Sequence, residues 1–232
     1  MRKQAVLVSL TVALFAASTA AASSRELERS IPATGVQSLA IHAAVGDLKI
    51  EPAKDDAIHV RVRLTPRKGG LFSSLRSSQN EVDAAKLKVK RSGNKLKIEI
   101  ATGTEKPRFE ATWSVELPAR LDLRLRLGVG DIEVSGSEGA LYVRDGVGDV
   151  DVTADASWIN VKVGVGDVSI RGSVAHFGEI KGTTGVGDAQ LEIPGRTLNG
   201  RGMVSKTLSW KGDGPGAMNL TTGVGDLQVS LR

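Results

Sequence analysis

The stretch LGVGDIEV, residues 127–134, contains a Gly-Val-Gly-Asp motif that recurs at residues 146–149, 164–167, 185–188 and 223–226. An earlier variant, AAVGDLKI, occupies residues 43–50. A ligand-binding loop is normally used once in a chain, whereas a structural corner is needed each time the chain turns. The repetition therefore predicts an architecture before it predicts a ligand.

The motif recurs at an interval typical of stacked repeats. Starting from Val129, the valines of successive motifs are 18, 18, 21 and 38 residues apart. The last interval is about two units long, so we expect a degenerate copy with Ser205 in the valine position and Thr207 in the aspartate position. Self-similarity with a period of about 20 residues is the signature of a solenoid or array.

Hydrophobic alternation surrounds each motif and changes phase within it. Apolar residues fall at every second position up to Val129, and the alternation resumes one residue out of phase at Ile132. Period-two alternation predicts strands with one buried face, and the change of phase predicts a turn that keeps that face inside. We expect the valine to lie with the inward residues, the glycine to adopt a backbone conformation that other residues resist, and the aspartate to accept hydrogen bonds from amides of its own turn.

These patterns predict an all-β fold, built as a parallel β-solenoid or β-helix with repeats of about 18–21 residues. The alternative is an antiparallel array of β-hairpins in which Gly-Asp forms each two-residue turn. The solenoid is favoured because stacked corners must share one shape, whereas separate hairpins need not. The predicted corner residues are Gly46, Asp47, Gly130, Asp131, Gly148, Asp149, Gly166, Asp167, Gly187, Asp188, Gly225 and Asp226.

The chain divides into three predicted segments. Residues 1–22 have a short basic start, an apolar run and small residues, which is the layout of a secretory signal peptide. Residues 23–117 form a β-rich segment with basic strands and a Gly- and Ser-rich loop at 65–85, in which at most a turn or two of helix is expected. Residues 118–232 hold the repeats.

The signal peptide predicts an exported protein that is periplasmic, on the cell surface or extracellular. No second apolar segment is long enough to span a membrane, and the chain contains no cysteine. We therefore expect no transmembrane span once the signal is removed, and stability that rests on backbone pairing and packing alone.

Charge is unevenly distributed along the chain. Residues 61–97 hold eleven Lys or Arg against two acidic residues, whereas residues 98–232 hold fourteen basic and eighteen acidic ones. Alternation places the basic residues of each N-terminal strand on one face. If these strands are neighbours, five cations share a surface for an anionic partner, namely Arg61, Arg63, Lys86, Lys88 and Lys90.

The stretch SVELPARLDLRLRLGVGDIEVSG, residues 114–136, enters a Gly-Asp corner through a proline and alternating strands. It resembles the bacterial putative adhesin family of exported domains of unknown function, and residues 43–64 resemble the N-terminal strand segment of that family. The resemblance implies an exported, β-solenoid-like, non-enzymatic domain with repeated Gly-Asp corners. It implies no catalytic residue.

Chemical sites are weakly indicated. The motif lacks the third glycine of dinucleotide-binding loops and the Gly-Lys-Ser/Thr of the P-loop, and no helix follows it. No cysteine nucleophile or Gly-x-Ser-x-Gly elbow exists, so we predict no catalytic residue, no cofactor and no resident metal. If the corner aspartates stack into a ladder, calcium binding is one alternative. If Arg144, Lys162 or Arg171 lies beside that ladder, a polysaccharide-acting β-helix enzyme is another.

The sequence thus favours an exported, non-enzymatic envelope-binding or structural module of adhesin-like type. Its expected partners are an anionic envelope polymer, a membrane surface or another envelope protein, and nucleic acid is not expected. The competing interpretation is a polysaccharide-acting or calcium-binding β-helix protein.

Overall fold

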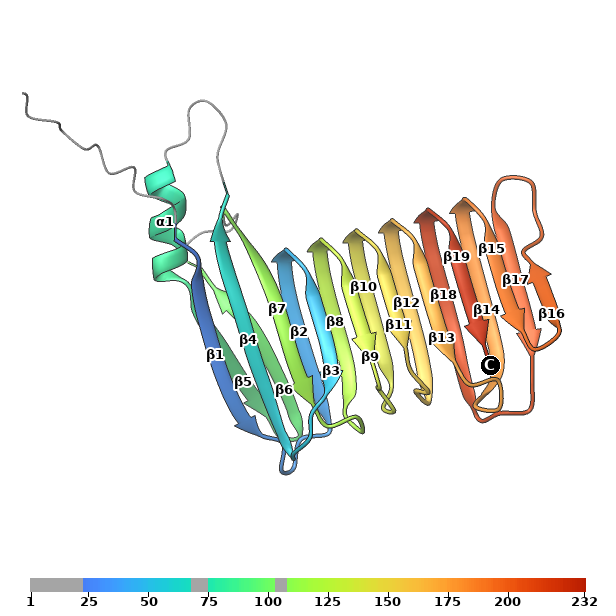
Figure 1. Ribbon diagram of the computed structural model, residues 1–232, viewed down its shortest axis with the longest axis horizontal. Coiled ribbons are helices and arrows are strands. Elements are labelled where there is room, and N and C mark those ends of the chain that lie inside the picture. Colours follow the sequence, from blue (N-terminus) through green and yellow to red (C-terminus); the bar gives the residue numbers. More distant parts are fainter. Residues whose placement is uncertain (1–22, 68–74, 103–107) are drawn as a thin grey trace, which may run out of the picture.

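The computed structural model describes residues 23–67, 75–102 and 108–232, so the predicted signal peptide lies outside the described residues. The described chain consists of β-strands and one helix, α1 (Leu75–Ala84), arranged as two facing sheets (Figure 1). This confirms the all-β prediction. The helix corrects the loop predicted at 65–85, because strand β4 continues to Pro66 and α1 fills residues 75–84.

The first sheet has ten strands. In spatial order they are β1 (Arg25–Pro32), β4 (Ala57–Pro66), β7 (Phe109–Leu117), β3 (Leu48–Pro52), β9 (Ile132–Ser135), β11 (Val150–Thr153), β13 (Val168–Gly172), β19 (Leu227–Leu231), β15 (Ala189–Ile193) and β16 (Arg196–Asn199).

The second sheet has nine strands. In spatial order they are β17 (Lys206–Lys211), β14 (Phe177–Val186), β18 (Gly216–Val224), β12 (Trp158–Val165), β10 (Leu141–Val147), β8 (Asp122–Val129), β2 (Ser38–Val45), β6 (Lys95–Ala101) and β5 (Lys86–Ser92).

Each Gly-Asp motif joins a strand of the nine-stranded sheet to a strand of the ten-stranded sheet. Since β8 and β9 lie in different sheets, the Gly130-Asp131 corner is not a hairpin turn. We call each such strand pair a coil. Neighbouring coils pair in parallel, as β10 does with β8 and β11 with β9, whereas β1, β5, β16 and β17 pair antiparallel at the two ends. The sheets are therefore mixed.

The spatial order of the coils differs from their order in the sequence. The last coil of the chain, β18–β19, lies between β12–β13 and β14–β15. The expected degenerate copy is wrong as well, because β17 runs antiparallel to β14 and places Thr207 opposite Thr183. The 38-residue interval is thus an antiparallel end piece, β16 and β17, followed by a return to the middle of the stack.

The core lies between the two sheets and is filled by alternate residues of every strand. Trp113, Leu123, Leu125 and Ile132 are almost completely buried. Each sheet contains strands from both sides of residue 117, where the N-terminal segment was predicted to end. Strand β2 lies beside β8 and strand β3 beside β9, so the N-terminal strands and the repeats share the same two sheets. At the N-terminal end, α1 packs near β4 and β7 and buries Val82.

Candidate functional site: corners and sheet faces

The corner needs glycine at two positions for two different reasons. Gly148 has a φ of 149°, and a Cβ built there would lie 1.9 Å from the carbonyl oxygen of Gly130 in the neighbouring coil. At Gly146, a Cβ would lie 2.4 Å from the carbonyl oxygen of Gly128. Stacked backbones approach too closely at both positions for any side chain, so the repeated glycines follow from the stacking itself.

The aspartates link neighbouring coils. The Oδ1 atom of Asp131 accepts a hydrogen bond from the backbone amide of Asp149 at 2.9 Å, and Asp149 accepts one from Asp167 at 2.8 Å. The same bond joins Asp47 to Asp131, Asp167 to Asp226, and Asp226 to Asp188. The expectation that each aspartate bonds within its own turn is therefore wrong, because the amide that each of these carboxylates accepts belongs to the neighbouring coil.

A lysine ends this aspartate ladder. Lys206, at the start of β17, forms an ion pair with the carboxylate of Asp188. The described residues contain no group of three or more His, Cys, Asp or Glu side chains placed to hold a metal ion. The geometry thus gives each corner carboxylate a structural hydrogen bond.

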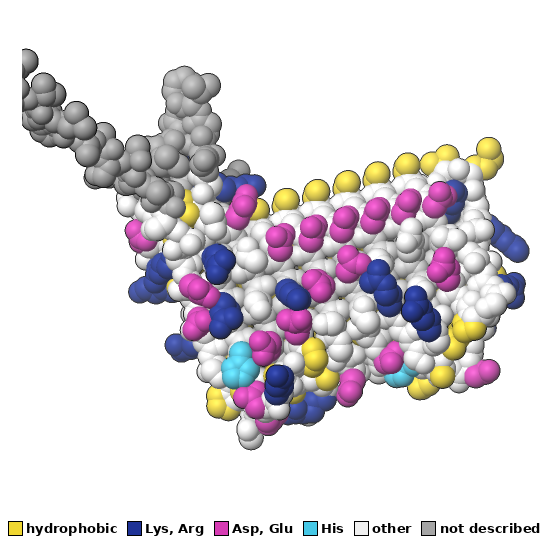
Figure 2. Space-filling model, viewed as in Figure 1, with side chains coloured by type: hydrophobic (Ala, Val, Ile, Leu, Met, Phe, Trp, Pro, Cys, Tyr) yellow, Lys and Arg dark blue, Asp and Glu magenta, His cyan; other side chains and the backbone are white. Residues whose placement is uncertain are grey.

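The corner valines lie outside the core, against expectation. Val129, Val147, Val165, Val186 and Val224 are each about half exposed, because the chain turns between Leu127 and Ile132 and points the intervening side chain outward. The residues before and after the corner, Leu127 and Ile132, are buried as predicted. Figure 2 shows the outcome as a row of apolar side chains along one edge of the molecule, above a row of acidic ones.

One inward position carries an acid. Asp145 is 3% exposed, and neither carboxylate oxygen has a hydrogen-bonding partner. Burial raises its pKa from 3.8 to about 6, although the nearby backbone amide of Gly146 opposes part of the rise, and the Asp131 and Asp149 carboxylates add smaller contributions. At the equivalent position of two other coils, the hydroxyls of Thr222 and Thr184 donate to the carbonyls of Gly166 and Gly225.

The five cations predicted to share a surface lie on two sheets. Arg61 and Arg63 belong to β4 of the ten-stranded sheet, where Arg61 pairs with Glu26 at 3.0 Å and Glu28 at 2.6 Å. The other three, Lys86, Lys88 and Lys90, belong to β5 of the nine-stranded sheet. The two strands are not neighbours, so the predicted stripe is split.

The lysines of β5 instead continue into a larger basic surface. In-register pairing places Lys90 beside Lys97, and Arg124 and Arg126 of β8 follow on the same outer face. Arg144 lies in register with Arg126, and Lys162 with Arg144. We call this surface the basic face, with the members Lys88, Lys90, Lys97, Arg124, Arg126, Arg144 and Lys162.

Sequence reasoning did not assign five of these members to the basic surface: Lys97, Arg124, Arg126, Arg144 and Lys162. For the last four the signal was present. In RLDLRLRLG, residues 120–128, the alternation of a strand places Arg124 and Arg126 on the face opposite to the buried leucines. Arg144 and Lys162 occur at the same repeat position as Arg126, 18 residues apart. Stacking the repeats in register would have aligned these three cations.

Two titratable groups on the basic face, Glu99 and His42, have shifted pKa values. Glu99 accepts a 2.6 Å ion pair from Lys97, which together with Lys90 and Lys88 lowers the pKa of its carboxyl. Partial burial, helped by the charges of Lys97 and Arg126, lowers the pKa of His42. Neighbouring cations contribute to both shifts, as the main cause for Glu99 and as a smaller one for His42.

A shallow groove of about 340 Å³ crosses the basic face over β8, β10 and β12. The Arg124 guanidinium lies 4.6 Å from the ring centroid of Tyr142, a cation–π contact that holds the arginine over the groove. The lining combines cations with an aromatic ring and an amide: Arg124, Arg126, Tyr142, Arg144, Asn160 and Lys162. Such a groove fits an extended anionic ligand better than a small reactive substrate.

The outer face of the ten-stranded sheet has a different character. Besides the aspartate ladder it carries Glu133 and Asp151, and Arg171 lies 3.8 Å from Asp151. Arg144 and Lys162 lie on the opposite sheet, so they do not meet Arg171 beside the ladder. Of the three cations named for the polysaccharide-acting alternative, Arg171 alone lies with the carboxylates, in a hollow of about 550 Å³ that Asp131, Glu133 and Asp151 also line.

Comparison with known proteins identifies related sequences and folds. A family model described as the N-terminal domain of toast_rack, DUF2154, matches residues 20–171. A crystal structure of a putative cell adhesion protein from Clostridium sporogenes ATCC 15579 is 18% identical, with a TM-score of 0.64, over 90% of this chain and 100% of that one. This likeness shows that the two proteins share a fold.

A second solved structure, a putative adhesin from Bacteroides fragilis NCTC 9343, is 14% identical with a TM-score of 0.33, over 90% of this chain and 98% of that one. No curated protein matches the sequence. In the part of the chain that the structure describes, no helix is long and apolar enough to cross a membrane.

Proposed function

The chain belongs to the family of toast_rack N-terminal domains, and on that premise we propose that it is an exported, non-enzymatic, adhesin-like module that binds an anionic polymer of the cell envelope. The observation that carries the proposal is the basic face, where cations from β5, β6, β8, β10 and β12 lie in register on one side of the molecule. The description of a similarly folded protein as a putative cell adhesion protein supports this class of function.

The spacing of the cations suits a repeating ligand. Neighbouring strands lie about 4.8 Å apart, so Arg126, Arg144 and Lys162 form a row with one positive charge per strand. A polymer with regularly spaced carboxylates or phosphates can engage several of these cations at once. Each exposed pair contributes little by itself, and binding depends on their number.

The parallel solenoid arrangement is part of the proposal. Six coils pair in parallel in one continuous stack, and antiparallel strands lie at both ends. Stacked repeats of this kind present extended surfaces, which repeat proteins use for binding. Location at the periplasmic or outer surface follows from the predicted signal peptide.

The test compares two triple variants with the same change in net charge. K88E/K90E/R124E alters the basic face, and K49E/R63E/R171E alters exposed cations of the other sheet. Co-sedimentation of the purified protein with cell-wall sacculi, outer-membrane vesicles and phosphatidylglycerol liposomes is measured at low and high salt. We expect binding to sacculi or vesicles that high salt reverses, because added ions screen exposed charges.

The basic-face variant should lose at least tenfold in affinity, whereas the control variant should lose less than twofold. Equal losses in the two variants would show that net charge alone governs binding. Binding to liposomes in preference to sacculi and vesicles would assign the face to lipid headgroups. Absence of binding to all three materials would overturn the proposal.

A further inference from the structure

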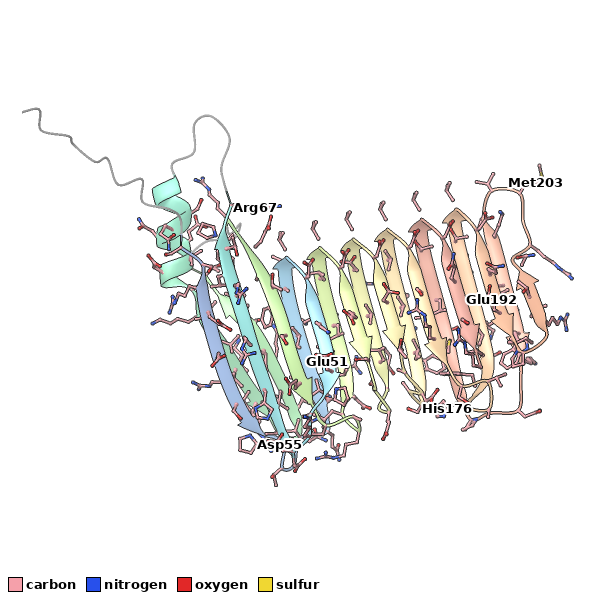
Figure 3. All side chains as sticks on the ribbon, viewed as in Figure 1. Glu51, Asp55, Arg67, His176, Glu192 and Met203 are labelled. Carbon is pink, nitrogen blue, oxygen red and sulfur yellow. The ribbon has the colours of Figure 1, made fainter. Side chains whose placement is uncertain are left out.

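The corner valines form a continuous apolar ridge. In spatial order the ridge consists of Val45, Val129, Val147, Val165, Val224 and Val186, each in register with the next. Five of them are 45–55% exposed, and Met203 and Val204 add two more exposed apolar side chains. Figure 3 labels Met203 at the far end of this row.

The fold does not require valine at these positions. The glycines and the aspartate of the corner are explained by close approach and by the ladder, whereas the valine side chain fills no core space. Threonine has the same branched shape and also favours strands, and it would expose a hydroxyl instead of a methyl group. Isolated exposed apolar residues are ordinary, but a contiguous row of them marks a contact surface.

Charges of opposite sign flank the valine ridge. On the side of the ten-stranded sheet lies the aspartate ladder, and on the side of the nine-stranded sheet lie Arg126, Arg144 and Lys162. Three consecutive coils therefore carry an acid on one side of the valine and a base on the other. Within the described chain these three cations make no ion pair, nor do the carboxylates of Asp131, Asp149 and Asp167.

We propose that the valine ridge is the contact surface between two copies of this chain, packed ridge to ridge about a two-fold axis parallel to the ridge. This axis places each coil opposite the same coil of the other copy and exchanges the two flanks. The aspartate row of each copy therefore faces the row Arg126, Arg144 and Lys162 of the other. An axis across the ridge would instead set acid against acid. The charge pattern is thus self-complementary in one arrangement, as an isologous interface requires.

The size of the ridge sets the strength of the contact. Six valines at about 4.8 Å spacing span about 24 Å, and the ridge is only one side chain wide. Its area is below the roughly 800 Å² per partner of a standard interface. Self-association should therefore be weak, with a Kd on the order of 10 μM to 1 mM, and should matter where copies are concentrated on a surface.

The association is measured by sedimentation equilibrium of the purified protein up to about 1 mM at low salt. V147T/V165T/V224T should weaken dimerisation at least tenfold with little change in thermal stability. D131N/D149N/D167N keeps the acceptor oxygens of the ladder but removes three charges, and it should also weaken dimerisation. The control E51Q/E133Q/D151N removes three carboxylates from the same sheet and should leave dimerisation unchanged.

The symmetry is tested by cross-linking. The chain has no cysteine, so V129C introduces a single thiol. A two-fold axis along the ridge places residue 129 opposite its own copy, and oxidation should give a covalent dimer because a disulfide needs Cα atoms within about 7 Å. An axis across the ridge would separate the two thiols by about three strand spacings, roughly 14 Å. T153C, on the sheet face, should not cross-link.

A protein that stays monomeric to 1 mM would overturn the inference, as would dimerisation that V147T/V165T/V224T does not alter. Both proposals use Arg126, Arg144 and Lys162, so they are separated by variants that lie outside this shared row. The valine variants leave Lys88, Lys90 and Arg124 in place and should bind sacculi or vesicles normally, whereas K88E/K90E/R124E should dimerise normally.

Discussion

At the corner formed by residues 146–149, each residue has a distinct physical role. Gly146 and Gly148 leave room for the carbonyls of the neighbouring coil, Val147 faces outward, and the carboxylate of Asp149 accepts the amide of Asp167. The sequence alone identified the corner, because the phase of the alternation changes there. It did not reveal the outward valine, since an apolar residue at the end of an alternating strand looks like one more core residue.

Replacement of Gly148 tests the stacking of the corners. Gly148→Ala adds a Cβ that meets a backbone oxygen at 1.9 Å, and it also forces a positive φ on alanine. We expect a loss of about 3 kcal/mol or more in the free energy of unfolding, measured by urea denaturation.

Gly93→Ala is the matched control, because Gly93 has a φ of 60° but no atom within 4 Å of the place that a Cβ would occupy. It should cost only about 1 kcal/mol, the strain of the backbone conformation alone. Equal losses for the two variants would mean that the close approach between coils adds nothing to the cost of replacing Gly148.

Asp145 makes stability depend on pH. Its pKa is raised from 3.8 to about 6 in the folded protein, so the folded state holds a proton that the unfolded state has already released between these values. Stability therefore falls as pH rises from 3.8 to 6 and stays lower above pH 6. The shift corresponds to a penalty on the order of 3 kcal/mol at neutral pH.

Asp145→Thr should remove this penalty, because threonine at the equivalent positions 184 and 222 donates to a corner carbonyl. We expect a higher melting temperature at pH 7.5 and little change at pH 4, measured by calorimetry. A variant equally or less stable than the wild type at pH 7.5 would contradict the assignment of Asp145 as a destabilising buried acid.

At the scale of elements, the sequence predicted strands and corners but not their order. Every Gly-Val-Gly-Asp corner has the same shape, so any coil can stack on any other, and the sequence contains no local signal that places β18–β19 beside β12–β13. The 38-residue interval could be filled by a degenerate coil or by an end piece. Only the antiparallel pairing of β16 and β17 decides between them.

Removal of residues 214–232 tests the inserted coil. The truncation deletes β18 and β19 and leaves β12, β13, β14 and β15 each with an unpaired edge in the middle of the stack. We expect the truncated protein to lose its cooperative thermal transition, which is measured by circular dichroism.

A peptide of residues 214–232 added to the truncated protein should restore the transition, since it can fill the gap between the two coils. A truncated protein that melts within a few degrees of the full chain would show that the last coil is peripheral to stability.

At the scale of the whole molecule, the two sheets give the protein two chemically different faces. The ten-stranded sheet presents the aspartate ladder with mixed charges, and the nine-stranded sheet presents the basic face. Linear charge counts located the excess of cations in residues 61–97 but could not assign faces, because β4 and β5 enter different sheets. Part of the basic face comes instead from the repeats, whose overall composition is acidic.

The most direct measurement is an NMR titration of the purified protein with polygalacturonate, a soluble polyanion, following the arginine Nε–Hε resonances. Contact through the basic face should shift Arg124, Arg126 and Arg144 and leave Arg61, Arg63 and Arg171 unchanged, and added salt should reverse the shifts. Shifts confined to the arginines of the ten-stranded sheet, or spread evenly over both sheets, would contradict the assignment of the binding surface.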